Sequence, residues 1–450
     1  MANLCPYCFD NKGLQSRLVE IRPKYDEGFC DYHPTRKAIP VGAVAAIVDE
    51  VFRANYLIAG ADWIPGDEEE PGYYGAQRGM SLAETLEELV LPTEPEILTD
   101  LVGQLLEDDF YLPQRGKMAF YDEDQCYERI EGDDGGHGAL WETFCQSVTY
   151  EQRFLNPNAH ELLGKIFQNI HLQKDVSQNY PVRVLKPEDN PPILRARVVT
   201  RHDRHKVIHD PEGELGPAPG RLGRSNRMNA AGIRAFYGAF DVQTCISELR
   251  PIVGSEIMFA EFYLMRDVVV LDTTRFSSAP KELNLFARDH VRRLSQWRFM
   301  QRFMTEIARP VSPDDEPFDY VATQVVAEYL NRVHTVRIGR KIRMIEGILY
   351  RSAQRPEGIN IVLLADAARV EVRLKPPSIR SPSFGLGKLR SEPPTPPTLA
   401  MVTGSLRSAK VGAAEYAASP AAEPWTFKLR PGEELPQPPE DDLDGPSAVD

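Results

Sequence analysis

Residues 226–251, NRMNAAGIRAFYGAFDVQTCISELRP, decide the fold of the second part of this 450-residue chain. Residues 233–240 are rich in β-branched and aromatic side chains, which suit a half-buried strand. Asp241 ends that strand and can cap a helix over residues 242–250, and Pro251 ends the helix because it has no backbone N–H to donate. The sequence therefore predicts a loop, a strand and a helix that form one compact unit.

Three polar side chains of this unit stand out, Arg227 in the loop, Tyr237 in the strand and Glu248 in the helix. A fixed cation, an aromatic hydroxyl and a carboxylate held together suit an anionic ligand that contains a sugar. Each residue also has a purely structural explanation. Arg227 could form a surface ion pair, Tyr237 could be a strand aromatic, and Glu248 could lie on a solvated helix face.

Length and charge limit the classes of protein to which the chain can belong. A chain of 450 residues exceeds one ordinary domain, so we expect two domains and tails. The net charge of −14 argues against broad nucleic-acid or membrane binding, although the segment 195–204 is locally basic. An anionic ligand must therefore be bound by a local group of basic residues.

The N-terminus lacks the apolar stretch of a signal peptide, and no run approaches the roughly 18 apolar residues of a membrane-spanning helix. We therefore expect a cytoplasmic protein with no membrane partner. In that compartment the six cysteines are expected to be thiols or metal ligands rather than disulfides.

The pairs Cys5/Cys8 and Cys30/His33 lie within residues 1–36, separated by 21 residues. Two short-range pairs on either side of a loop can supply the four ligands of a tetrahedral structural zinc ion. The alternative is that the two pairs lie in surface turns, with the cysteines as reduced thiols that bind no metal. We predict a structural zinc site formed by these four residues.

Residues 37–181 are predicted to form a helical domain, because apolar residues recur at helical spacing from Val41, from Leu82 and from Leu140. Acidic, Gly-containing segments at 66–79 and 123–138 are predicted to be connecting loops, without the spacing of a calcium-binding loop.

Residues 182–373 are predicted to form a mixed α/β domain, and residues 374–450 a disordered, Pro-rich tail. The motif HDRHKVIHD covers residues 202–210, and its histidines His202, His205 and His209 could bind a metal. Their spacing favours a mobile loop instead. In the tail, PxxP recognition is an alternative to a solubilising acidic segment.

Five short motifs follow one another in the α/β region. They contain Arg195 in LRAR, Arg227 in NRMNAAGI, Tyr237 in FYGA, Glu248 in SELRP and Ser352 in GILYRSAQ. In their order and spacing they resemble the RES domain, named after Arg, Glu and Ser, over about residues 185–364. The similarity includes YVATQVVAEYL from Tyr320 and departs from many relatives in having NRM in place of GRM or GRW. The helical region resembles the HEPN-like region attached to some RES-domain proteins.

The resemblance implies an α+β protein whose RES domain is similar to ADP-ribosyltransferase toxin folds. It implies an NAD-degrading enzyme, an NAD phosphorylase or glycohydrolase that uses phosphate or water, acting as a toxin or defence effector with a protein regulator or antitoxin.

In that reaction Glu248 would stabilise positive charge on the ribose, and Arg195 and Arg227 would hold phosphate groups. Tyr237 would stack on nicotinamide or donate to a phosphate, and Ser352 would bond the ribose or phosphate.

Two alternatives remain open. The first is a HEPN-type ribonuclease, which rests on Arg153 and His160 alone. The second is a nucleotide-binding module without chemistry.

Overall fold

The computed structural model describes residues 2–26, 28–65, 73–109, 119–130, 135–218, 223–281, 283–309, 316–371 and 396–413. The described chain combines helices and sheets, with a helical N-terminal region, which confirms the predicted α+β class. The acidic clusters at 68–70 and 133–134 and the Pro-rich segment from residue 436 lie outside the described residues. No helix in these ranges is both long and apolar enough to cross a membrane.

Residues up to 130 form an N-terminal module around one apolar core. Its main helices carry the predicted apolar spacing, and Ser81 caps α3 through a reciprocal pair of hydrogen bonds with Glu84. The helical prediction missed the strands β3 to β8, which are two to five residues long and have no sustained alternation of polar and apolar residues. The elements of the module are β1 (Asn3–Leu4), η1 (Pro6–Cys8), α1 (Lys12–Ile21), η2 (Arg22–Lys24), β2 (Gly28–Phe29), β3 (Lys37–Pro40), α2 (Val41–Asn55), β4 (Tyr56–Ile58), β5 (Ala61–Pro65), β6 (Tyr73–Gln77), β7 (Met80–Ser81), α3 (Leu82–Val90), α4 (Pro95–Asp108) and β8 (Cys126–Arg129).

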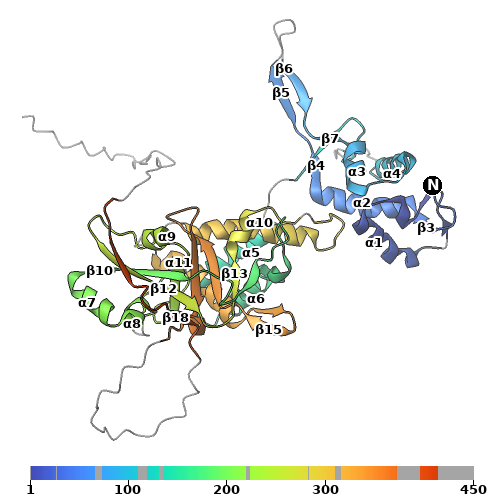
Figure 1. Ribbon diagram of the computed structural model, residues 1–450. Helices are drawn as coiled ribbons and strands as arrows, with labels where there is room; N and C mark the ends of the chain where they lie inside the picture. Colours follow the sequence, from blue (N-terminus) through green and yellow to red (C-terminus); the bar gives the residue numbers. More distant parts are fainter. Residues whose placement is uncertain are drawn as a thin grey trace, which may run out of the picture.

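A segment from much later in the chain contributes to this core. Phe286 is 1% exposed and belongs to the apolar cluster of the N-terminal module. Asn284 Nδ2 donates to Asn11 Oδ1 over 2.7 Å, and Arg288 pairs with Glu20 over 2.6 Å. The module is thus attached to the residues that directly precede α10, as Figure 1 shows.

A nine-stranded sheet organises the rest of the described chain, in the order β18-β12-β10-β11-β17-β16-β13-β9, with β19 also paired to β12. Its pairs are antiparallel except for the parallel pair β13–β16. The strands are β9 (Val182–Leu185), β10 (Ile193–Val199), β11 (Ala235–Ala239), β12 (Glu256–Leu264), β13 (Val268–Asp272), β16 (Gly347–Arg351), β17 (Ile359–Leu364), β18 (Leu399–Met401) and β19 (Arg407–Lys410). The remaining elements are α5 (Gly135–Gln146), η4 (Ser147–Glu151), α6 (Pro157–Ile166), η5 (Ile170–Leu172), α7 (Arg201–His209), α8 (Pro211–Leu215), α9 (Val242–Ser247), η7 (Thr273–Ser277), α10 (His290–Ala308), α11 (Glu316–Arg332), β14 (Thr335–Ile338), β15 (Lys341–Met344) and η8 (Ala365–Ala368).

Both faces of this sheet are buried, because successive strand residues enter different cores. In β13, Val269 and Leu271 join the core that contains α5, α6, α10 and α11, whereas Val268 and Val270 join the core on the other face. Helices of the HEPN-like region therefore pack into the same core as the central sheet, as Figure 1 also shows.

Two segments differ from the sequence prediction. The His-rich segment expected to be a loop forms α7, whose N-terminus is capped by Thr200 through the Asp203 N–H. Within the expected disordered tail, residues 396–413 are described and add β18 and β19 to the edge of the sheet beside β12. β18 and β19 are only three and four residues long, so they show no alternating strand pattern in the sequence, and β12 supplies their pairing.

Candidate active site and metal centre

A cavity opens where β10 and β11 separate. Within these two strands, β10 pairs with β11 only at Leu194 and Ala239. Beyond that pair, Arg195 Nη1 donates to the Tyr237 carbonyl over 2.7 Å, so a side chain replaces a strand hydrogen bond. Gly238 permits the close approach, because a Cβ there would lie 2.4 Å from Ile193 Cγ2.

The cavity has a volume of about 420 Å³ and contains four of the five predicted site residues in its wall. These are Arg195, Arg227, Tyr237 and Glu248. The wall also contains further polar and aromatic side chains, which include Asn226, Arg250, Tyr320, Tyr350 and Asn360.

The loop that carries Arg227 is fixed by side chains from α11 and β11. The backbones of Asn226 and Asn229 bond to each other in both directions, over 2.9 and 3.2 Å. Thr323 Oγ1 donates to the Arg227 carbonyl over 2.6 Å, and Gln324 Nε2 donates to the Asn226 carbonyl over 2.8 Å. The YVATQ motif from Tyr320 thus positions the arginine loop.

The Arg227 guanidinium is held by the last carbonyls of α10. Its two terminal nitrogens donate to the backbone oxygens of Glu306 and Arg309, and its charge lies 5.0 Å from the centre of the Tyr320 ring. The end of a helix carries partial negative charge, which favours a cation there. Among the described residues no carboxylate neutralises Arg227, so its charge is available to a ligand.

Arg195 is in a similar situation deeper in the cavity. Its guanidinium lies 4.9 Å from the centre of the Phe236 ring and bonds to a backbone carbonyl, with no carboxylate partner in the described chain. Burial lowers the pKa of Arg195 to about 10, so it stays charged at neutral pH at a desolvation cost. A bound anion would remove part of that cost.

The cavity is positive although the chain is acidic. Its wall contains three arginines, Arg195, Arg227 and Arg250, and one carboxylate, Glu248, which gives a formal charge of 3 − 1 = +2. The whole chain carries −14. This contrast favours an anionic ligand at this place on the protein.

The carboxylate of Glu248 is oriented by two donors. Ser352 Oγ donates to Glu248 Oε1 over 2.5 Å, and Asn360 Nδ2 donates to the same oxygen over 2.8 Å. Because both bonds fall on Oε1, the second oxygen has no hydrogen bond within the described residues. The arrangement holds a carboxylate at the cavity wall with one oxygen free for a ligand.

Ser352 itself has no hydrogen-bonding capacity left. Its oxygen accepts from the backbone N–H groups of Gln354 and Arg355, each over 3.1 Å, while its only proton goes to Glu248. A hydroxyl has one donor and two acceptor sites, and all three are occupied here. The structure thus brings Ser352 to Glu248 rather than to the open cavity.

The Tyr237 hydroxyl is also engaged within the protein. It donates to Asn229 Oδ1 over 2.8 Å and accepts from the Met228 N–H over 3.1 Å. Burial raises the pKa of Tyr237 above its usual value, so the hydroxyl remains a donor. Tyr237 therefore stabilises the Arg227 loop, and its ring forms part of the cavity wall.

The NRM departure does not strain the backbone. Asn226 has no positive φ, so its position does not require glycine.

The residues of the site that were not predicted from the sequence include Asn360, Thr323 and Gln324. The YVATQ motif contained the last two, but no local pattern shows which loop they hold. Asn360 lies in a buried strand and is 2% exposed. Because burial of a polar group without a hydrogen bond is costly, a polar residue in such a strand indicates a specific partner.

The alternative site in the helical region does not form on one helix. Arg153 precedes Asn156, which caps α6, and Pro157 occupies the first turn of that helix. His160 lies on α6 with its ring edge-on to Tyr329, 6.0 Å between ring centres. The two residues therefore do not share a helix face.

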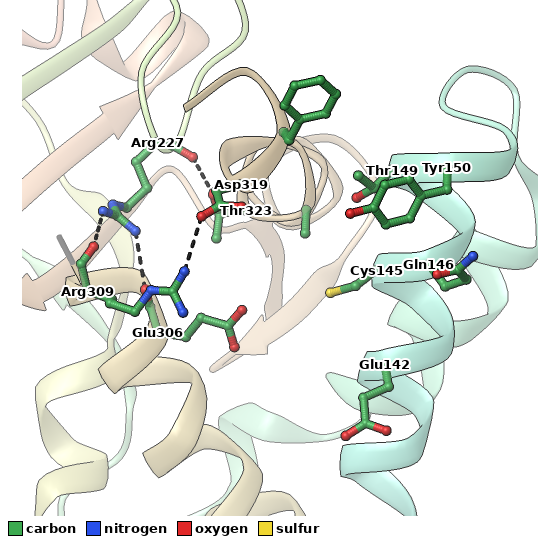
Figure 2. Close-up of a pocket in the computed structure, with 12 residues that line it drawn as sticks. Glu142, Cys145, Gln146, Thr149, Tyr150, Arg227, Glu306, Arg309, Asp319 and Thr323 are labelled. Atoms are coloured by element: carbon green, nitrogen blue, oxygen red, sulfur yellow. Dashed lines mark hydrogen bonds and ion pairs between the residues drawn. The ribbon is translucent and has the colours of Figure 1, made fainter. Parts of the chain in front are cut away.

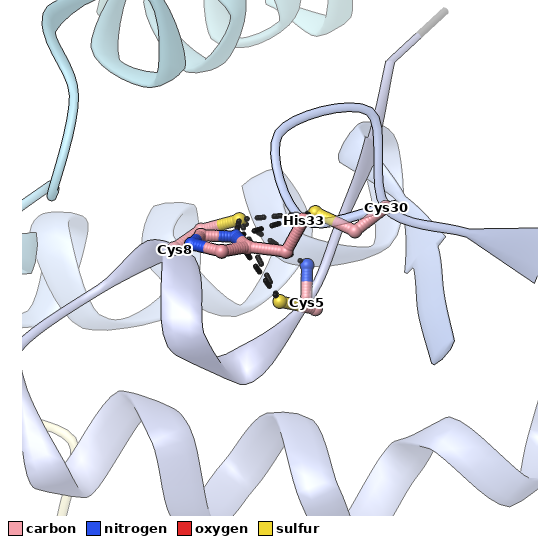
Figure 3. Close-up of side chains that lie close together, drawn as sticks. All are labelled: Cys5, Cys8, Cys30 and His33. Carbon is pink, nitrogen blue, oxygen red and sulfur yellow. Dashed lines mark hydrogen bonds between the residues drawn. The ribbon is translucent and has the colours of Figure 1, made fainter. Parts of the chain in front are cut away.

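The four predicted metal ligands lie together near the N-terminus (Figure 3), with their ligand atoms all within 4.8 Å of one another. The sulfur atom of Cys8 lies 3.9 Å from that of Cys5 and 3.4 Å from that of Cys30. Nδ1 of His33 lies 3.6, 3.6 and 3.8 Å from the sulfurs of Cys5, Cys8 and Cys30.

A tetrahedral zinc ion with ordinary Zn–S and Zn–N bonds requires edges of about 3.8 Å between sulfurs and about 3.5 Å between sulfur and nitrogen. Five of the six edges, between 3.4 and 3.9 Å long, lie close to these values, so the group can hold such a metal ion.

Comparison with known proteins gives two matches. The family model described as RES domain matches residues 195–385, and the model described as HEPN/RES N-terminal domain 1 matches residues 24–161. The first match contains every predicted RES site residue, and the second contains Cys30 and His33 but begins after Cys8. No curated protein and no solved structure matches the chain.

Proposed function

Because the chain belongs to the RES family and carries a HEPN-like N-terminal region, we propose that it degrades NAD by cleaving the bond between nicotinamide and ribose. The observation that carries the proposal is the cavity in which an oriented carboxylate, Glu248, faces arginines without carboxylate partners. NAD combines a pyrophosphate anion with a ribose whose C1′ bears a cationic leaving group. Both parts meet a complementary group in this cavity.

Glu248 acts on the ribose in the proposed reaction. The C1′–N1 bond breaks, its electron pair neutralises the pyridinium nitrogen, and positive charge develops on C1′ and the ring oxygen. The unbonded oxygen of Glu248 stabilises this charge directly or through a ribose hydroxyl. Ser352 and Asn360 keep the carboxylate in place, so it does not have to reorient during the reaction.

Arg195 and Arg227 hold the phosphate groups. Each offers a planar fork of donors that suits phosphate oxygens better than the point charge of lysine. Phosphate or water then adds to C1′ and loses a proton, which yields ADP-ribose 1″-phosphate or ADP-ribose. The third arginine of the wall, Arg250, gives an attacking phosphate a counter-charge.

The test is incubation of the purified full-length chain with NAD, with and without inorganic phosphate, followed by product identification. We expect release of nicotinamide by the parental chain and its loss in Glu248→Gln. NAD binding without nicotinamide release would support a non-catalytic nucleotide-binding module. If the chain neither binds NAD nor releases nicotinamide, the proposal is contradicted.

A toxin or defence role follows from the proposed chemistry, because loss of NAD stops growth. We expect induced expression to arrest growth of a host cell and Glu248→Gln to relieve the arrest. A protein regulator or antitoxin would then be a factor whose co-expression restores growth without changing the amount of the enzyme.

For the four N-terminal ligands we propose a structural zinc ion. The ligand set is complete, and Cys5, Cys8 and Cys30 are at most 2% exposed, which leaves no open coordination position for a substrate. The ion would fix the segment that precedes α1 to the loop before β3. It takes no part in the proposed reaction.

A further inference from the structure

A second cavity adjoins the candidate active site and shares Arg227 with it. It has a volume of about 300 Å³ and lies between the HEPN-like elements α5 and η4 and the RES elements α10 and α11. Figure 2 shows Arg227 and Arg309 on one side of this cavity and Tyr150 on the other. Glu248 lines only the first cavity, whereas Arg227 lines both.

The chemistry of the second cavity differs from that of the first. Its wall contains two arginines and three carboxylates, Glu142, Glu306 and Asp319, which gives a formal charge of 2 − 3 = −1. Arg309 is already paired with Asp319 over 3.1 Å. This wall does not favour an anion, but its carboxylates can accept hydrogen bonds from N–H donors of a neutral ligand.

Two aromatic rings of the wall are exposed. Tyr150 is 72% exposed and Phe318 is 57% exposed, and both line the cavity although neither is needed to fill a core. Tyr150 is carried by η4, a single π-helical turn at the end of α5. Such turns are rare and are frequently found at functional sites. Exposed aromatic rings beside hydrogen-bond acceptors suit a flat, nitrogen-rich ring.

We propose that the second cavity is a purine subsite, in which Tyr150 and Phe318 contact the adenine of NAD and the HEPN-like region completes the active site. The inference rests on the proposed function. With the pyrophosphate on Arg227, the nicotinamide riboside extends toward Glu248 and the adenosine toward η4. Each cavity alone lies near the lower end of the roughly 300–1,000 Å³ of drug-sized ligand pockets, and a dinucleotide is a long ligand.

The test compares NAD with nicotinamide mononucleotide, which has the same scissile bond but no adenosine. Loss of a stacking side chain weakens the binding of a base, so we expect Tyr150→Ala and Phe318→Ala each to lower kcat/KM for NAD about tenfold. The kcat/KM for nicotinamide mononucleotide should stay within about twofold of the parental value. Tyr150→Phe, which keeps the ring, should preserve most of the NAD activity.

Phe154 provides the matched control. It is 81% exposed and close in sequence to Tyr150, but it lies outside the wall of the cavity. Phe154→Ala should leave kcat/KM unchanged for both NAD and nicotinamide mononucleotide.

Unchanged kcat/KM for NAD in the double variant Tyr150→Ala/Phe318→Ala would overturn the subsite. An equal loss for both substrates would also overturn it, because the cavity would then hold the nicotinamide end or support the fold.

If the parental chain releases nicotinamide from neither substrate, the proposed function fails, and calorimetric NAD binding decides on the subsite. Weaker NAD binding in the two alanine variants, with parental binding in Phe154→Ala, would support it. Equal binding in all of them, or no binding by the parental chain, would overturn it.

Discussion

Replacing Ser352 by alanine tests how the candidate active site orients its carboxylate. The substitution removes the 2.5 Å hydrogen bond from Ser352 Oγ to Glu248 Oε1 and leaves the bond from Asn360. A hydrogen bond to a charged group contributes about 1.5–3 kcal/mol. If that contribution is realised in the transition state, kcat should fall roughly 10- to 150-fold.

The expected effect is on kcat rather than on KM, because the three hydrogen-bonding sites of Ser352 are all occupied within the protein. We expect KM for NAD to change by less than about twofold. Nicotinamide release at saturating and at low NAD separates the two parameters. The substitution also removes the acceptor for the N–H groups of Gln354 and Arg355. The thermal unfolding temperature therefore shows whether the loss of this turn destabilises the fold.

A double-mutant cycle with Glu248→Gln makes the test specific. If Ser352 acts through the carboxylate, Ser352→Ala should have little further effect once Glu248 is neutral. A large increase in KM with unchanged kcat would show that Ser352 contacts the substrate directly. Additive effects of the two substitutions would equally refute the reasoning.

Three further predictions concern the charged residues Glu248 and Arg227, the metal ligands and the strand glycine. Glu248→Gln should retain NAD affinity and lose turnover, because the carboxylate acts mainly in the transition state. Arg227→Lys should weaken NAD binding about tenfold in calorimetry, since the point charge of lysine cannot replace the planar fork of guanidinium donors. Cys8→Ser should abolish the single equivalent of zinc found by elemental analysis and lower the unfolding temperature, while the folded fraction still cleaves NAD. Gly238→Ala should destabilise the fold by more than about 2 kcal/mol in denaturant unfolding, because the new Cβ meets Ile193 and the Leu194 carbonyl.

Matched controls exist for two of these changes. Cys126→Ser removes a cysteine outside the metal group and should leave the zinc content unchanged. In α4, a Cβ at Gly103 has no neighbour within 4 Å, so Gly103→Ala should stabilise the helix by about 0.5–1 kcal/mol. Zinc loss in the first control, or equal destabilisation by both glycine substitutions, would contradict the corresponding argument.

The local part of the site could be predicted from the sequence because its signals are local. Asp241 caps α9 by accepting from the Thr244 N–H, as the strand-to-helix pattern indicated. The apolar runs at residues 256–264 and 359–364 predict two strands, and β12 and β17 occupy these residues. In contrast, the amphipathic pattern that predicts a helix over residues 281–308 starts too early. α10 begins only at His290, because residues before it contact the N-terminal module.

The non-local part of the site could not be predicted in the same way. The second cavity joins Glu142 and Tyr150 to Glu306 and Phe318, pairs more than 150 residues apart in the sequence. Helical periodicity shows that each helix has an apolar face, but not which helix it meets. The partner of Asn360 is similarly hidden, because a single buried amide does not indicate which distant carboxylate it will bond.

The packing of the HEPN-like helices yields a last prediction, on where the chain can be divided. In the core on the α10 side of the sheet, Trp141 and Phe144 from α5 and Leu163 from α6 are at most 4% exposed and pack with Trp297 and Phe303. A fragment that begins at residue 182 lacks these helices and exposes the apolar faces that they cover.

Each of these large apolar side chains contributes about 1.5–3 kcal/mol when fully buried. Loss of three or more is comparable to the whole stability of a domain, about 5–15 kcal/mol. We therefore expect the fragment 182–413 to be unfolded or aggregated by circular dichroism and size-exclusion chromatography, and the fragment 135–413 to fold and to bind NAD. Cooperative unfolding of the shorter fragment at the same temperature as the longer one would show that α5 and α6 only rest on the RES core, and it would remove the physical basis for assigning them a share of the active site.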